Sequence, residues 1–163
     1  MDKVVESYFV DIIKNVLGLT DQNVWIASQD IKIPKDDGFY IIISNYNTKI
    51  VAANPYFDTD TNKNVIQSTQ REDIQIDLFS KGNTARDQRA NIVMALNSYY
   101  SQSIQEKENF RIFKVPTSFL NTTELEGGSM LNRFTIRVSC YTWNRLEVDY
   151  PYYDTFSEET IYD

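Results

Sequence analysis

The sequence predicts an α+β domain: a mostly antiparallel sheet with two main helices packed on one face, followed by a C-terminal arm. Two stretches, residues 3–17 and 85–104, repeat apolar residues at helical spacing. Other stretches alternate apolar and polar residues, which favours antiparallel strands with one buried face. With 163 residues, the chain is long enough to bury on the order of 70% of its unfolded surface. We therefore expect one domain over residues 1–148 and an arm over residues 149–163.

The first expected helix covers residues 3–17. Its apolar stripe repeats at intervals of three and four residues and consists of Val5, Tyr8, Phe9, Ile12 and Val16, widened by Ile13 and Leu17. Gly18 follows directly, at the position where helices favour a left-handed cap.

The next elements are expected to be strands. Val24–Ala27 is a short candidate, and Phe39–Ser44 and Thr48–Ala53 are predicted to form a hairpin around a turn at Asn45–Asn47. Pro55 is expected to end this hairpin.

An exposed loop is expected over residues 56–67, which are rich in Asp, Thr and Asn, followed by a strand over Ser68–Phe79. Because side chains alternate along a strand, its two faces are expected to differ. One face carries Ile74, Ile76 and Leu78, and the other carries Asp73, Gln75, Asp77 and Phe79.

A capping box at Thr84 and Asp87 predicts the start of the second main helix, over residues 85–104. Phe110–Val115 and Arg133–Trp143 are expected to be strands, separated by a polar loop. The longer strand, which Leu146 and Val148 extend past a bend, is expected to direct Phe134, Ile136, Val138 and Cys140 to one side and Arg137, Ser139, Tyr141 and Trp143 to the other. Cys140 is interpreted as a small core residue rather than a reactive thiol.

Composition argues against most enzyme classes. The chain has no histidine and one cysteine, which excludes Ser-His-Asp and Cys-His catalysis and the common zinc sites. It has no glycine-rich phosphate-binding loop, and its net charge of -7 disfavours wrapping of duplex DNA. The longest apolar run, Phe39–Ile43, is too short to span a membrane. We expect no enzymatic activity, no cofactor, no metal and no membrane contact.

Carboxylates are the remaining candidates for chemistry. Asp73 and Asp77 would suit a Mg²⁺-dependent nuclease, but Glu72 alternates to the opposite strand face. The preferred interpretation is that these carboxylates are solvated strand residues near a sheet edge.

Arginine and aromatic residues share one face of the late strand, a composition typical of protein interfaces. Ordinary cross-strand pairing with carboxylates such as Asp77 is an equally open interpretation. The candidate interface residues in the domain are Arg71, Phe79, Arg133, Arg137, Tyr141 and Trp143.

The arm has five acidic residues and no basic ones, with aromatic residues interleaved. We expect it to dock on the basic and aromatic face of a neighbouring subunit, and a disordered tail is the alternative. Its candidate interface residues are Tyr150, Tyr152, Tyr153 and Phe156.

The stretch Arg71–Phe79, followed by Gly82, Ala85 and Ala90 and by a helix ending near Ser98, resembles the strand-to-helix core of bacteriophage neck and tail terminator proteins. The resemblance covers roughly Val24–Phe156 and includes the stretches Gly38–Ile43, Arg133–Val138 and Val148–Phe156.

This resemblance implies a structural virion protein at the head–tail connection. Such a protein forms a hexameric ring on the last ring of the tail tube, stops tail polymerisation and contributes to the neck. The implied partners are further copies of the chain, the tail tube protein and the head-completion or connector protein, with the sheath protein as a further candidate. DNA passes through the ring without specific binding, and assembly takes place in the host cytoplasm. The alternatives within the same virion are a head-completion or stopper protein and a minor tail protein.

Overall fold

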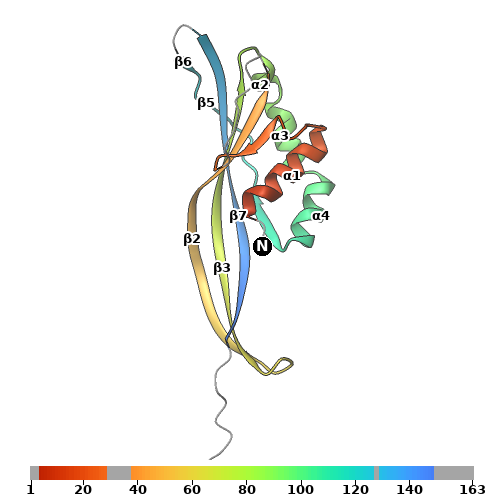
Figure 1. Ribbon diagram of the computed structural model, residues 1–163, viewed down its shortest axis with the longest axis vertical. Coiled ribbons are helices and arrows are strands. Elements are labelled where there is room, and N and C mark those ends of the chain that lie inside the picture. Colours follow the sequence, from red (N-terminus) through yellow and green to blue (C-terminus); the bar gives the residue numbers. More distant parts are fainter. Residues whose placement is uncertain (1–3, 29–37, 127–128, 149–163) are drawn as a thin grey trace, which may run out of the picture.

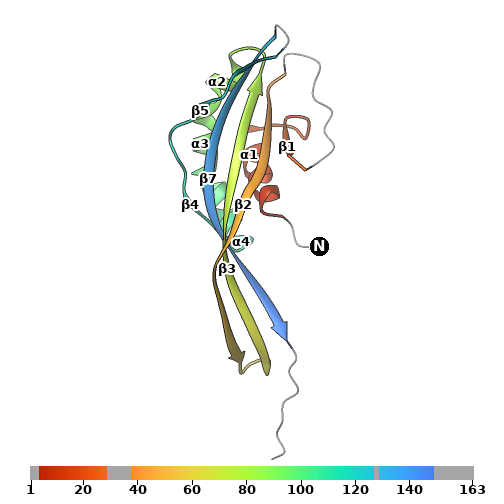
Figure 2. The same ribbon diagram turned by 90° about the vertical axis from the view of Figure 1, so that its left-hand side faces the viewer.

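The computed structural model describes residues 4–28, 38–126 and 129–148, and it has the α+β architecture that the sequence predicts. One sheet runs the length of the molecule, and the helices cover one face of its upper half (Figure 1). Below the helices, three strands continue together as a long projection (Figure 2). The predicted arm over residues 149–163 lies outside the described residues.

The sheet has the strand order β1-β2-β3-β7-β4, and the two short strands β5 and β6 also pair with β7. β1 is parallel to β2, whereas every other pairing among the described residues is antiparallel. The strands are β1 Val24–Ile26, β2 Tyr40–Asp58, β3 Lys63–Ser80, β4 Phe110–Lys114, β5 Leu120–Asn121, β6 Glu124–Glu126 and β7 Ser129–Val148.

Helix α1 (Val5–Leu17) has the predicted amphipathic form and ends at Gly18, whose φ of 64° is the left-handed cap that the sequence suggests. Phe9, Ile12 and Ile13 are fully buried against the sheet. Val16 was expected in the buried stripe, but it is 37% exposed because the packed face turns toward Ile13.

The core lies between the helices and one face of the sheet. The predicted inward faces of the Ser68–Phe79 and Arg133–Trp143 strands are confirmed, and β7 continues without interruption to Val148. The strand side chains in this core are Val24, Ile41, Ile43, Ile74, Ile76, Leu78, Phe110, Phe134, Ile136, Val138 and Cys140.

The predicted hairpin around Asn45–Asn47 is wrong. β2 continues through this segment, with register shifts between Asn45 and Asn47 and between Ile50 and Ala52, and pairs with β3 along its whole length. These irregularities are β-bulges, which accommodate turn-forming residues within a paired strand. Pro55 therefore lies inside β2, and the expected loop over residues 56–67 is the end of the long β2–β3 hairpin.

The predicted second helix is divided into α2 (Thr84–Asp87), α3 (Arg89–Leu96) and α4 (Tyr99–Lys107). The break after Leu96 arises because Ser98 acts as the N-cap of α4, its hydroxyl accepting a hydrogen bond from the Ser101 N–H at 3.1 Å.

The expected capping box at Thr84 and Asp87 is also wrong. The residue before α2 makes no side-chain capping bond, and the hydroxyl of Ser80 accepts from the Ala85 N–H at 3.0 Å instead.

Candidate interaction surfaces

The sheet face opposite the helices, here called the outward face, carries most of the candidate residues from the sequence. Side chains alternate along β3 and β7, and the alternate set to the buried core residues points to this face. The candidates that the register assigns to it are Arg71, Phe79, Arg133, Arg137, Tyr141 and Trp143. Trp143 lies at the edge of β7, where it also borders a pocket on the helical side. The four candidates in the C-terminal arm lie outside the described residues; they are Tyr150, Tyr152, Tyr153 and Phe156.

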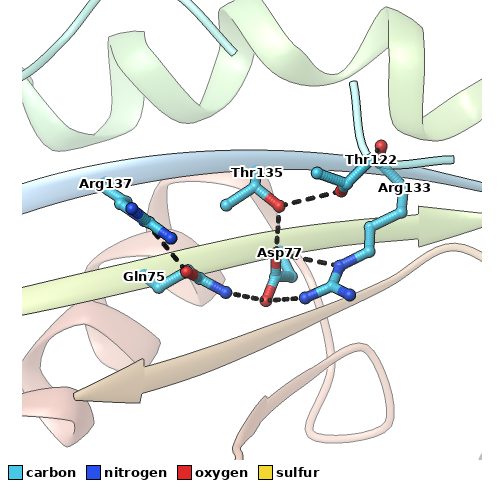
Figure 3. A network of polar contacts seen from close by, with 6 residues as sticks. All are labelled: Gln75, Asp77, Thr122, Arg133, Thr135 and Arg137. Carbon is cyan, nitrogen blue, oxygen red and sulfur yellow. Dashed lines mark hydrogen bonds and ion pairs between the residues drawn. The ribbon is translucent and has the colours of Figure 1, made fainter. Parts of the chain in front are cut away.

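Asp77 is the centre of a polar network on the outward face (Figure 3). Only 4% of the residue is exposed, and its carboxylate accepts hydrogen bonds from Arg133 at 3.1 and 3.2 Å. Gln75 donates to it at 2.9 Å, and the Thr135 hydroxyl donates to the other oxygen. The negative charge is therefore both paired and fully hydrogen-bonded, which burial of a carboxylate requires.

Asp73, four residues before Asp77 on the same face of β3, has a similar environment. Its carboxylate accepts from Ser139 at 2.6 Å, Asn47 at 2.9 Å and Arg71 at 3.0 Å. Burial alone would raise the pKa of Asp73, but these hydrogen bonds and the Arg71 charge outweigh it and hold the pKa below its ordinary value.

Both aspartates contradict the expectation of solvated residues near a sheet edge. β3 is a central strand, and neighbouring side chains from β2 and β7 enclose both carboxylates. Glu72 lies on the opposite face, as expected, and is also buried, accepting from Asn45 at 2.7 Å and from Thr48. Within the described ranges, no group of three or more metal-ligating side chains is arranged to hold an ion.

Arginine side chains stack on aromatic rings across the outward face. The Arg133 guanidinium lies 5.3 Å from the centroid of Phe79, which in turn stacks on Tyr40 at 4.9 Å. Arg137 lies 5.0 Å from the ring of Tyr46, which the bulge in β2 leaves half exposed. Pairing with a carboxylate is confirmed for Arg133 and Asp77, and stacking on aromatic rings within the domain is a further contact of these arginines. The role of this face as a protein interface stays a prediction.

A basic row crosses this face from one edge to the other. The register places Lys49 beside Arg71, Arg71 beside Tyr141, and Tyr141 beside Arg111 on β4. Arg71 contacts Asp73, but Lys49 and Arg111 form no ion pair with any described residue. Like charges on directly opposed strand positions repel, so this row favours an anionic neighbour.

The second candidate surface is the projecting arm, which is distinct from the C-terminal arm over residues 149–163. We use this term for residues 48–58 of β2, 63–70 of β3 and 143–148 of β7, which extend beyond the helices (Figures 1 and 2). The face of the arm that continues the buried core face has no helix over it and carries the exposed apolar side chains Ile50, Pro55, Phe57, Ile66 and Leu146.

Three of these residues form one cross-strand row, because Pro55 pairs with Ile66 and Ile66 pairs with Leu146. Leu146 is 60% exposed and Ile66 36% exposed, which is unusual for an apolar row aligned across three strands. Sequence reasoning missed this surface because residues 56–67 were interpreted as a loop. The β-branched residues Val65, Ile66 and Thr69 are the sequence signal that favours a strand here.

Ion pairs join the three strands on the other face of the arm. Arg145 contacts Asp58 at 2.7 Å and Glu147 at 3.3 Å, and Lys63 contacts Glu147 at 2.9 Å. A hydrogen bond from Arg145 lowers the pKa of Asp58, and one from Lys63 lowers that of Glu147. The charged side and the apolar side of the arm are therefore distinct.

A pocket of about 680 Å³ opens where the helical layer ends and the arm begins. It lies between the start of α1, the residues after α4 and the sheet, and Glu6, Glu72 and Glu108 contribute acidic side chains to its wall.

None of the helices in the described part of the chain is long and apolar enough to cross a membrane. No model of a known protein family and no curated protein matches this chain.

Proposed function

We propose that this chain is a structural virion protein, a bacteriophage tail terminator that forms a hexameric ring on the end of the tail tube and contributes to the neck. The observation that carries the proposal is the projecting arm, whose apolar row has no covering element among the described residues. Sheet faces of this kind are normally buried, so the arm is suited to contact with other protein chains.

The edges of the arm support assembly as well. β1 pairs with β2 only between Ile41 and Ile43, and on the side of β7 that faces away from β3, β4 pairs no further than Thr142. Both edges of the arm therefore have no further strand partner in the described residues. Two different edges on one molecule favour heterologous contacts, which generate closed rings when the rotation between subunits closes.

The carboxylates support a structural role rather than a nuclease. Asp73 and Asp77 are each engaged by an arginine and by neutral donors, so their oxygen atoms are already used. A catalytic metal would have to displace these bonds.

Electron microscopy of the purified protein, alone and mixed with tail tubes of the encoding phage, tests the proposal. We expect six-fold rings, or monomers that become rings on tube ends, and tubes of uniform length. Gold labelling of assembled particles separates a tail terminator from a head-completion or minor tail protein, because each occupies a different level of the virion. A protein that neither forms rings nor binds tubes or heads would refute the assignment.

A further inference from the structure

We propose that residues 149–163 of one copy bind the basic row on the outward face of a neighbouring copy. This inference rests on the proposed function, because it requires copies of the chain to meet. It names the interface that would join them: an acidic, tyrosine-rich segment on a strip of lysine, arginine and tyrosine.

The receptor is the row formed by Lys49, Arg71, Tyr141 and Arg111. Close to it, Arg137 is exposed and its Nε donates to the Gln75 side chain at 3.2 Å, without a carboxylate partner among the described residues. Within the row, Arg71 is paired with Asp73, whose other hydrogen bonds come from Asn47 and Ser139. The row therefore presents the positive charges of Lys49 and Arg111, which no described carboxylate neutralises.

The ligand is complementary in charge and in side-chain type. Residues 149–163 contain five carboxylates, no basic side chain and five aromatic rings. Carboxylates form strong charge-assisted bonds with arginine, and tyrosine rings stack on guanidinium groups. Exposed aromatic rings on the receptor extend this match, since Phe113 packs edge-on against Tyr141 at 6.1 Å and is 72% exposed.

The position of the segment favours a neighbouring copy over its own domain. β7 runs from Tyr141 in the row to Val148 at the end of the projecting arm, so β7 ends far from its own row and points away from it (Figure 2). Fifteen residues can span about 50 Å when extended, which gives the segment the length to extend beyond its own domain. The segment and the basic row are different parts of the chain, and a head-to-tail ring requires two different contact surfaces on each copy.

The test uses charge exchange in the full-length chain, with self-association measured by sedimentation velocity over a range of concentrations. The row variant is Lys49→Glu with Arg111→Glu, and the segment variant is Asp154→Lys with Glu158→Lys. We expect each to weaken self-association by about tenfold or more, since several charge contacts are reversed together. Combining all four substitutions should restore much of it. Arg86→Glu, an exposed arginine on α2, is the matched control and should leave association unchanged.

Mixing the row variant with the segment variant distinguishes binding between copies from binding within one copy. Only the mixture contains an intact segment on one chain and an intact row on another, so it should form pairs that neither variant forms alone. A synthetic peptide of residues 149–163 should bind the wild-type row and dissociate the oligomers, and the row variant should not bind it.

Three outcomes would overturn the inference. The first is that the row variant associates as tightly as wild type. The second is that the variant with all four substitutions does not regain association. The third is that a labelled duplex DNA binds the row while the peptide does not. If wild-type rings form and these variants leave them intact, the docking fails and the proposed function stands. If wild type forms no rings and caps no tubes, the proposed function fails, and the peptide titration alone then decides the docking.

Discussion

Arg133 on β7 reaches diagonally across the sheet to Asp77 on β3, where two of its nitrogen atoms donate to the two carboxylate oxygens at 3.1 and 3.2 Å. The two residues are 56 positions apart in the sequence. Asp77 is nearly inaccessible while Arg133 keeps a third of its side chain in solvent. The pair therefore joins two central strands, and the buried carboxylate depends on the partly exposed arginine.

Replacing Arg133 with methionine should destabilise the fold by about 2–3 kcal/mol, because Asp77 would keep a buried charge without its cation. Because Arg133 is partly exposed, the expected loss of unfolding free energy is smaller than that for breaking a fully buried ion pair. Urea unfolding measures the change, and Arg137→Met, two residues along the same strand face, is the control. Arg137 is exposed, stacks on Tyr46 much as Arg133 stacks on Phe79, and donates only to a neutral amide among the described side chains, so its loss should cost about 1 kcal/mol or less. Equal losses for the two variants would contradict the importance of the Asp77 pair.

Acid should destabilise the protein below about pH 4. The pKa of Asp73 is lower in the folded chain than its ordinary value of 3.8, so protonation favours the unfolded state. The stabilisation is complete above the unfolded-state pKa and is lost as the pH falls through the lower, folded-state pKa. Thermal unfolding between pH 2 and pH 7 measures it, and Asp73→Asn should flatten the acid limb relative to wild type. An unchanged acid limb in that variant would argue against the prediction.

Cys140 should be unreactive in the native protein. Burial is the main cause, and the negative charge of Glu72 the second, that raises the pKa of its thiol to about 12. Only the thiolate attacks a disulfide reagent, so the protonated thiol does not react. Since it is the single cysteine of the chain, labelling by a chromogenic disulfide at pH 8 reports this one site. We expect negligible labelling in buffer and complete labelling in denaturing urea. Rapid labelling without denaturant would indicate that β7 opens locally at this position.

The apolar row of the arm should be required for assembly and not for folding. Leu146→Asp should abolish ring formation on tail tubes, because it places a charge at the most exposed end of the row formed by Pro55, Ile66 and Leu146. Its effect on the unfolding free energy should stay within about 0.5 kcal/mol, since the side chain is already exposed. Leu120→Asp is a matched control, because Leu120 on β5 is also 60% exposed but lies outside the arm. If both variants assemble normally, the projecting arm is not the contact surface.

Local sequence patterns predict the features that depend on neighbouring residues alone, such as a helix, its end and the buried face of a strand. The spacing of Phe9 and Ile12 and the glycine at position 18 predict α1 and its end, because the helix period and the left-handed cap are local properties. The alternation of Ile74, Ile76 and Leu78 likewise predicts which face of β3 is buried. The same rule predicts the face of Phe79, Arg137 and Tyr141, and the register of β3 and β7 agrees with it.

Other features depend on residues that are distant in the sequence. Asn45–Asn47 and Pro55 have the composition of turns, yet they lie in β2 because pairing with β3 outweighs their local preference. Asp73 and Asp77 are buried because arginines, hydroxyls and amides from other strands satisfy them, and alternation cannot reveal such partners. The row of Lys49, Arg71, Tyr141 and Arg111 exists only when four strands are in register. Periodicity therefore determined which side each residue faces, and strand register, which is set by long-range packing, decided which residues meet there.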